Sequence, residues 1–173
     1  MNQDFKNALW ATANKLRGSV DPSDYKYPVL GLIFLKYVSE SFFARQEQLA
    51  GFFADPENVD FFIEDKTDRA AAMEERDYYT MENVFWVAEK ARWPFLQANA
   101  KQPHLAGLLD DAMRLIEAEN PKLNNLLPKV YVRTALEPNT LGALVDLAAS
   151  LHFTHTEDGG DLLGDVYEYF LCK

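Results

Sequence analysis

The sequence predicts a mainly α-helical protein, a single helical-bundle domain over residues 1–173 that packs around a buried central helix. Three observations predict this class. The run Pro28–Val38 is apolar except for Gly31 and Lys36, so it lacks the polar stripe of a surface helix. Later segments repeat apolar residues every three or four positions. Hydrophobic residues make up 48% of the chain, which is enough for a domain of this length to form its own core.

The N-terminal part predicts two helices. The first covers Asp4–Arg17 and is followed by Gly18, which suits the left-handed residue after a helix. Asp21–Asp24 is typical of a turn with capping side chains. A proline inside a helix removes a backbone hydrogen bond and biases the residue before it toward extended geometry. We therefore expect the central helix to begin near Pro28, or to have a distorted first turn, and to end near Leu49.

The middle of the chain is less regular. Ala54–Glu82 holds ten acidic and three basic residues, and aromatic side chains interrupt it, so we expect a helical or loop excursion rather than a disordered acidic run. Asn83–Val87 is short, β-branched and aromatic, and Val130–Val132 is the only comparable piece. These two segments are the candidates for one short two-stranded β element.

Four further helices are predicted, over Glu89–Asn99, Leu105–Ile116, Leu141–Ala148 and Asp161–Leu171. Pro94 sets the true start of the first of these helices, because proline favours the first turn. Asn120-Pro121 ends the second, and Asn139 is the predicted N-cap of the third.

The charge distribution limits the classes of function. The net charge is -10, yet residues up to Glu47 hold six basic and five acidic residues. A protein that binds nucleic acid alone usually has a basic excess, so any DNA contact should come from the N-terminal part or need a basic partner subunit. We expect a cytoplasmic protein for three reasons. The N-terminal residues Met1–Asp4 do not have the pattern of a secretory signal, and no apolar run approaches the roughly 20 residues of a membrane span. The single cysteine, Cys172, has no partner for an internal disulfide.

Six motifs resemble one known family. In chain order they are LW..A..LRG (Leu9–Gly18), YK (Tyr25-Lys26), VLGLIFLKYVSE (Val29–Glu40), FWV..KARW (Phe85–Trp93), IEAENPKL (Ile116–Leu123) and GDLLGDVYEYFL (Gly160–Leu171). Their order and spacing resemble the N-terminal domain of the modification subunit of type I restriction–modification systems. The resemblance covers nearly all of the chain and is weakest over Ala54–Glu82.

The resemblance implies a helical accessory domain of a DNA methyltransferase. The intact family subunit uses S-adenosylmethionine to methylate the exocyclic amine of adenine, pairs with a specificity subunit that reads the target, and joins a restriction subunit. Its N-terminal domain helps to enclose double-stranded DNA and is implicated in sensing existing methylation. The chain departs from the family pattern because Gly159-Gly160 precedes a predicted helix and Asn120-Pro121 is followed by Lys122. We therefore expect the catalytic, cofactor-binding domain to be absent from this chain, with no catalytic or cofactor residue present.

Four residues are the candidates for DNA contact. Lys15, Arg17 and Lys26 could touch phosphates, and Trp10 lies off the apolar stripe of its helix, where it could stack on a base. The alternatives stay open at this point: the three cations could be solvated or pair with acidic residues of the turn, and Trp10 could pack on a neighbouring helix. Trp86 and Trp93 could likewise stack on a base, but for all three tryptophans we favour packing on a neighbouring helix or subunit.

Other polar residues have less specific interpretations. Lys36 is expected to extend its charge to the surface or to pair with a carboxylate. His152 and His155 have the spacing of metal ligands beside Glu157 and Asp158, but we expect no metal site and a hydrogen-bonded core or helix-end role for His152. Two rival functions remain: an acidic DNA-mimic or regulatory interaction protein, and a small metal-dependent hydrolase.

Overall fold

The computed structural model describes residues 7, 14 and 22–153, and its regular structure there is helical. The α-helices are α2 (Pro22–Ala54), α3 (Lys66–Ala72), α4 (Asp77–Thr80), α5 (Trp93–Ala98), α6 (Leu105–Glu119), α7 (Tyr131–Thr134) and α8 (Pro138–Ala149), with 3₁₀ turns η1 (Glu89–Ala91) and η2 (Pro121–Leu123). The mainly α prediction is confirmed. The predicted helices over Asp4–Arg17 and Asp161–Leu171 lie outside the described residues. Among the described residues, no helix combines the length and apolarity that crossing a membrane requires.

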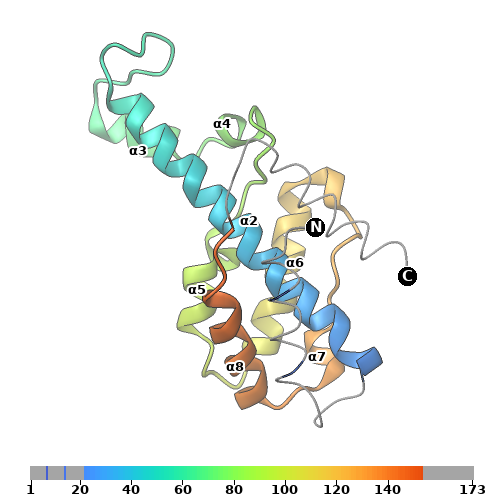
Figure 1. Cartoon of the computed structure of the whole chain (residues 1–173). Coiled ribbons are helices and arrows are strands. Elements are labelled where there is room, and N and C mark those ends of the chain that lie inside the picture. The colour runs from blue at the N-terminus through green and yellow to red at the C-terminus, as the bar shows by residue number, and fades with distance from the viewer. Residues whose placement is uncertain (1–6, 8–13, 15–21, 154–173) are drawn as a thin grey trace.

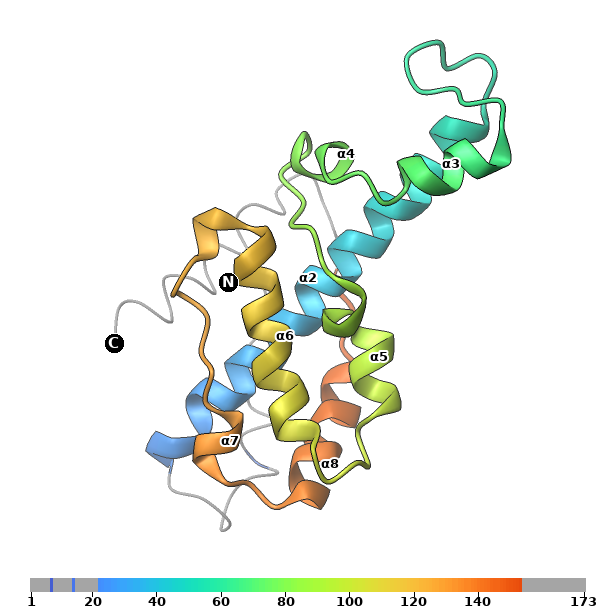
Figure 2. The ribbon, with the colours of Figure 1, turned by 180° about the vertical axis from the view of Figure 1, so that it is seen from behind.

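Helix α2 organises the fold. Every residue from Pro28 to Ser39 is buried, including Lys36, which confirms the prediction of a central helix without a polar face. Helices α5, α7 and α8 pack against α2, and α6 packs against α7, α8 and η1. Figures 1 and 2 show α2 running the length of this group and α6 crossing it, with α5 and α8 beside α6. Below, the body means these helices together with the 3₁₀ turns and loops that join them, over residues 22–53 and 83–153.

The bounds of α2 differ from the prediction. The helix begins at Pro22, so Pro22–Asp24 is helical rather than part of a separate turn, and Pro28 lies inside the helix. An interior proline costs about 3 kcal/mol, whereas each fully buried aliphatic side chain contributes about 1.5–3 kcal/mol. Because Val29, Leu30 and their neighbours are buried on all sides, the packing outweighs the local penalty.

The expected end of α2 near Leu49 is also wrong. The helix continues to Ala54 because Leu49 and Phe53 are both fully buried. Phe53 packs edge-on against Tyr78, with the ring centroids 5.0 Å apart. Residues that come later in the chain therefore supply the apolar cover that keeps the last turns of α2 helical.

The predicted β element is wrong for the described residues, which contain no strand. Asn83–Ala88 is irregular. The backbone groups of Trp86 hydrogen-bond to the Asn120 side chain instead of to a neighbouring strand. The Trp86 N–H donates to Asn120 Oδ1 at 3.1 Å, and Asn120 Nδ2 donates to the Trp86 carbonyl at 2.9 Å. Val130–Val132 instead enters α7, a single helical turn.

The predicted helices of the C-terminal half are largely confirmed. Helix α5 begins at Trp93 with Pro94 in its first turn, and α6 ends directly before Asn120. The predicted cap of α8 is wrong, because Asn139 lies inside the helix and Glu137 is the N-cap. Pro138 sets this boundary, since its fixed φ and missing N–H suit the first position of a helix.

The acidic segment Ala54–Glu82 forms a loop, α3 and α4. Asp65 caps α3 by accepting hydrogen bonds from the N–H groups of Thr67 at 2.7 Å and Asp68 at 3.1 Å. Both ribbon views place the loop and α3 at the C-terminal end of α2, away from α7 and α8 (Figures 1 and 2). The predicted helical or loop excursion therefore consists of a loop and two short helices that follow the C-terminal end of the central helix.

Candidate nucleic-acid interface

Most of the predicted DNA contacts lie outside the described residues. This holds for Trp10, Lys15 and Arg17. Lys26 lies within α2, four positions after Pro22, rather than in a turn before the helix. Its backbone is therefore fixed by the central helix, and the prediction that it contacts phosphate stays a prediction.

Lys36 has the role expected of it. Its Nζ lies 3.0 Å from Glu40 Oε1, one helical turn away, and the two side chains are 11% and 19% exposed. The same ammonium group lies 5.8 Å from the centre of the Trp93 ring. This lysine is occupied by its pairing with Glu40 and is not available to a phosphate.

Two arginines, Arg45 and Arg92, have structural roles. Arg45 binds the acidic segment, and Arg92 binds the chain that follows it. Arg45 donates to the Tyr78 carbonyl at 2.8 Å. Arg92 donates to the Val87 carbonyl at 3.0 Å, and its guanidinium lies 4.5 Å from the centre of the Phe42 ring. Both side chains therefore stabilise the fold.

Arg76 is a third link between the acidic segment and the body. It forms a two-pronged ion pair with Glu119, in which Nη2 donates to Oε1 at 2.8 Å. The hydrogen bond from Arg76 lowers the pKa of the Glu119 carboxyl, and the same bond raises the pKa of the guanidinium. Both groups therefore remain charged at neutral pH.

Five cations have neither an ion pair nor a hydrogen bond from their side chains, among the residues whose side chains the structure describes. They are all exposed: Lys66, Lys90, Lys101, Lys122 and Arg133. Four of the five belong to the body. None of them is among the predicted DNA contacts, although the sequence holds a signal: neither 90–109 nor 120–136 contains an acidic residue. Among the described side chains, these four lysine and arginine residues are the unneutralised positive charges of the body.

The turn that carries Arg133 is held at two points. The Asp110 carboxylate accepts the N–H of Tyr131 at 3.0 Å through Oδ1 and the N–H of Val132 at 3.2 Å through Oδ2. The Tyr131 hydroxyl donates to the Pro28 carbonyl of α2 at 2.7 Å. Burial, with a contribution from Asp110, raises the pKa of this phenol well above its ordinary value. Arg133 therefore projects from a rigid part of the body.

The two described tryptophans are buried in the core, which agrees with the packing interpretation rather than with base stacking. Trp86 is 4% exposed and Trp93 is 3% exposed. Trp86 packs edge-on against Phe42 and Tyr79, with centroids 5.3 and 5.1 Å away. Neither indole is accessible to an extruded base.

The histidine prediction is only partly right. His152 follows the end of α8, and its Nδ1 lies 3.4 Å from Glu40 Oε1. Its side chain is 83% exposed. The expected core position is therefore wrong, whereas the alternative position at a helix end fits. His152 is exposed because α8 ends at Ala149 and the apolar stripe does not extend to it. His155, Glu157 and Asp158 lie outside the described residues, and no group of three metal-ligating side chains occurs within the described part.

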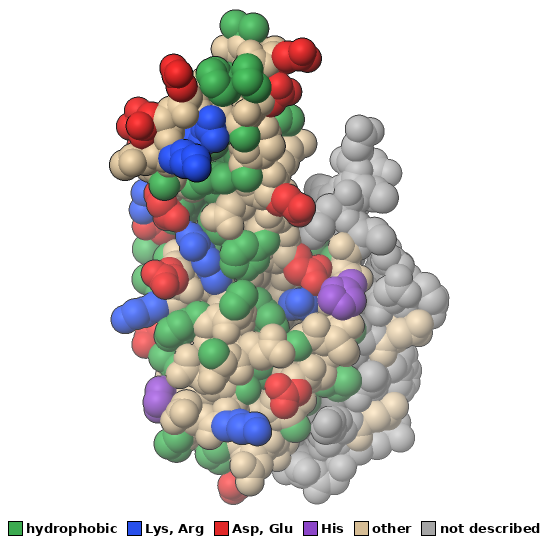
Figure 3. All heavy atoms as spheres, turned by 90° about the vertical axis from the view of Figure 1, so that its left-hand side faces the viewer, with side chains coloured by type: hydrophobic (Ala, Val, Ile, Leu, Met, Phe, Trp, Pro, Cys, Tyr) green, Lys and Arg blue, Asp and Glu red, His purple; other side chains and the backbone are tan. Residues whose placement is uncertain are grey.

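The net charge of the described part lies in the acidic segment. That segment has ten acidic and three basic residues, whereas the rest of 22–153 has ten of each. On the face shown in Figure 3, acidic side chains concentrate toward the end formed by the acidic segment. The body is thus neutral overall and carries free cations, while the acidic segment is strongly negative.

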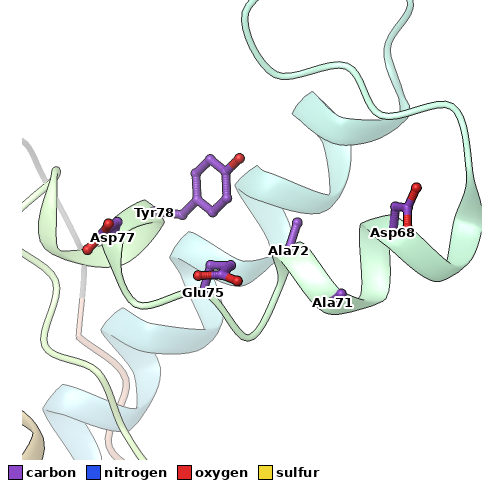
Figure 4. Close-up of a pocket in the computed structure, with 6 residues that line it drawn as sticks. All are labelled: Asp68, Ala71, Ala72, Glu75, Asp77 and Tyr78. Carbon is purple, nitrogen blue, oxygen red and sulfur yellow. The ribbon is translucent and has the colours of Figure 1, made fainter.

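A shallow hollow of about 500 Å³ lies between α3 and α4 and is lined by Asp68, Ala71, Ala72, Glu75, Asp77 and Tyr78. Figure 4 shows the three carboxylates spread along the hollow rather than converging on one point. This arrangement of the lining assigns no ligand to the hollow.

Comparison with known proteins identifies the family. The model of the HsdM N-terminal domain matches residues 5–147. The whole chain is 30% identical to part of the type I restriction enzyme MjaIX methylase subunit of Methanocaldococcus jannaschii and covers 31% of that protein. Over 103 residues, 48% of the chain, it is 34% identical to the type I restriction enzyme HindI methylase subunit of Haemophilus influenzae, covering 23% of that protein. The chain therefore spans about a third or less of these relatives, and it belongs to the HsdM N-terminal domain family of type I restriction enzyme methylase subunits.

Proposed function

We propose that this domain closes over one side of a DNA duplex within a type I adenine methyltransferase. The specificity subunit reads the base sequence, and this domain adds contacts to the phosphate backbone. The family match over residues 5–147 carries the proposal. In this arrangement the domain contributes binding and positioning, and no step of methyl transfer is assigned to its residues.

The segregation of charge supports an orientation on the duplex. Phosphates attract Lys and Arg and repel carboxylates, and exposed charges act over a distance of about 8–10 Å at physiological salt. The body offers the free cations Lys90, Lys101, Lys122 and Arg133, whereas the acidic segment has a balance of seven negative charges. The body would therefore face the DNA, together with Lys26, and the acidic segment would point away from it.

The partners follow from the same proposal. The specificity and restriction subunits bind the same modification subunit, and S-adenosylmethionine is the cofactor of the catalytic part of that subunit. The domain works in the cytoplasm, where the DNA is. The net charge of -10 explains why such a domain would need partners to hold the duplex, because its own long-range field repels DNA.

Charge reversal in the assembled methyltransferase tests the proposal. Arg17→Glu combined with Lys26→Glu should weaken binding to every DNA sequence alike and reduce the slope of log affinity against log salt by about 2. Fluorescence anisotropy at several salt concentrations measures both quantities. Lys66→Glu is the matched control, because it reverses an exposed, unpaired lysine in the acidic segment, and it should leave affinity unchanged.

The rival DNA-mimic function makes the opposite prediction. In that case the isolated chain would compete with DNA for a DNA-binding protein, and reversing charges in the acidic segment would abolish the competition. Unchanged affinity and salt slope in the double variant would remove Arg17 and Lys26 from the interface. Loss of binding in the Lys66→Glu control would contradict the proposed orientation.

A further inference from the structure

Glu40 of α2 contacts the chain where it leaves the last described helix. Glu40 Oε2 accepts a hydrogen bond from the Phe153 N–H at 3.0 Å, across 113 positions in the sequence. The other carboxylate oxygen, Oε1, lies 3.0 Å from Lys36 Nζ and 3.4 Å from His152 Nδ1. One carboxylate on the central helix thus holds two consecutive residues that follow α8.

The surroundings fix this carboxylate in place. The Lys36 and Glu40 side chains are 11% and 19% exposed, so their ion pair is largely shielded from solvent and is screened by salt less than a surface pair. Next to it, the Phe153 ring packs edge-on against Tyr37, with the centroids 5.6 Å apart. The Phe153 backbone and side chain therefore contact α2 at two neighbouring positions.

The backbone of this segment depends on α2 for its direction. Helix α8 ends at Ala149, and the N–H groups of Ser150 and Leu151 donate to Leu147 at 3.1 Å and Ala148 at 3.1 Å. Among the described residues, neither His152 nor Phe153 makes a backbone–backbone hydrogen bond. Within the described part of the chain, the polar contacts of residues 152–153 are with Glu40, and the Phe153 ring packs on Tyr37.

We propose that Glu40 is a latch that sets the direction in which the chain leaves the helical body. Releasing it frees residues 152–153 while α8 and the core remain folded, because the hydrogen bonds that end α8 do not involve α2. The latch needs no DNA, so it stands or fails independently of the proposed DNA contact.

Amide hydrogen exchange of the full chain, measured by NMR, tests the latch. A hydrogen bond to a charged group contributes enough for its loss to lower protection by about ten- to a hundredfold. Glu40→Ala should therefore lower the protection of the Phe153 amide by that factor. The Leu151 amide, which donates to the Ala148 carbonyl at 3.1 Å, should keep its protection, because it reports on the end of α8.

Two variants complete the design. Glu40→Gln keeps an acceptor oxygen without the charge, so it should give a smaller loss at Phe153, and it carries the test if the alanine variant does not fold. Glu47→Ala removes an exposed carboxylate from the same helix and should change neither amide. Unchanged protection at Phe153, or an equal loss at Phe153 and Leu151 in both Glu40 variants, would overturn the latch.

Discussion

The contact between Gly31 and Tyr131 makes a sharp prediction about the central helix. Gly31 lies in the buried part of α2, directly opposite the hydroxyl that Tyr131 donates to Pro28. A Cβ at position 31 would overlap Tyr131 Oη and lie 3.0 Å from Met113 Cε. Gly31→Ala should therefore destabilise the protein, although alanine is the better helix former.

The expected magnitude follows from three opposing effects. Replacing glycine by alanine in a helix stabilises it by about 1 kcal/mol. Inserting a methyl group into a packed core costs about 1–3 kcal/mol, and displacing the Tyr131 hydroxyl from Pro28 removes a hydrogen bond worth about 1 kcal/mol. The net result is a loss of about 2 kcal/mol in the free energy of unfolding, within the range of these terms.

A double-variant cycle isolates the clash. Tyr131→Phe removes the hydroxyl that meets the new methyl group, so Gly31→Ala should cost less in the Tyr131→Phe background, by about 1–2 kcal/mol. Urea unfolding followed by far-ultraviolet circular dichroism measures each corner of the cycle, with an unchanged m-value as the check for two-state behaviour.

Gly51→Ala is the matched control for this experiment. Gly51 lies in the same helix, is exposed, and has nothing within 4 Å of the position of a Cβ. The substitution should stabilise the protein by up to about 1 kcal/mol. If Gly31→Ala is as stable as the original protein, or if its effect and that of Tyr131→Phe simply add, the proposed steric conflict does not exist.

Two further predictions concern the same region. Asp110→Asn should lower the free energy of unfolding by about 1–3 kcal/mol, because the carboxylate accepts the N–H groups of Tyr131 and Val132. The exposed neighbour gives the control, since Asp111→Asn should stay within about 0.5 kcal/mol of the original in the same urea titration. Burial raises the pKa of Tyr131 in the folded protein, so its stabilising effect is complete below about pH 10, the ordinary pKa, and declines at higher pH. Urea midpoints between pH 9 and 11 should fall more steeply in the original protein than in Tyr131→Phe, and parallel curves would contradict this assignment.

The sequence alone determined which helix forms the centre of the protein. An uninterrupted apolar run has no face that water can solvate, so Pro28–Val38 had to be buried whatever packed around it. Local sequence signals also determined the end of α6 and the start of α5. Asn120-Pro121 stops a helix, and Pro94 favours the first turn of one, whatever the rest of the fold does. The pairing of Lys36 was also predictable, since a lysine on a buried helix needs a carboxylate within reach and Glu40 lies one turn away.

Only the tertiary structure decided the features that depend on distant residues. Helix α2 extends across Pro28 because packing on all sides outweighs a local penalty. Val130–Val132 enters a helical turn rather than a strand because Asp110, about twenty positions earlier, accepts its N–H groups. His152 is exposed beside Glu40 because α8 ends before it. Local pattern fixes what must be buried, whereas partners far along the chain fix which backbone hydrogen bonds form and which cations stay free.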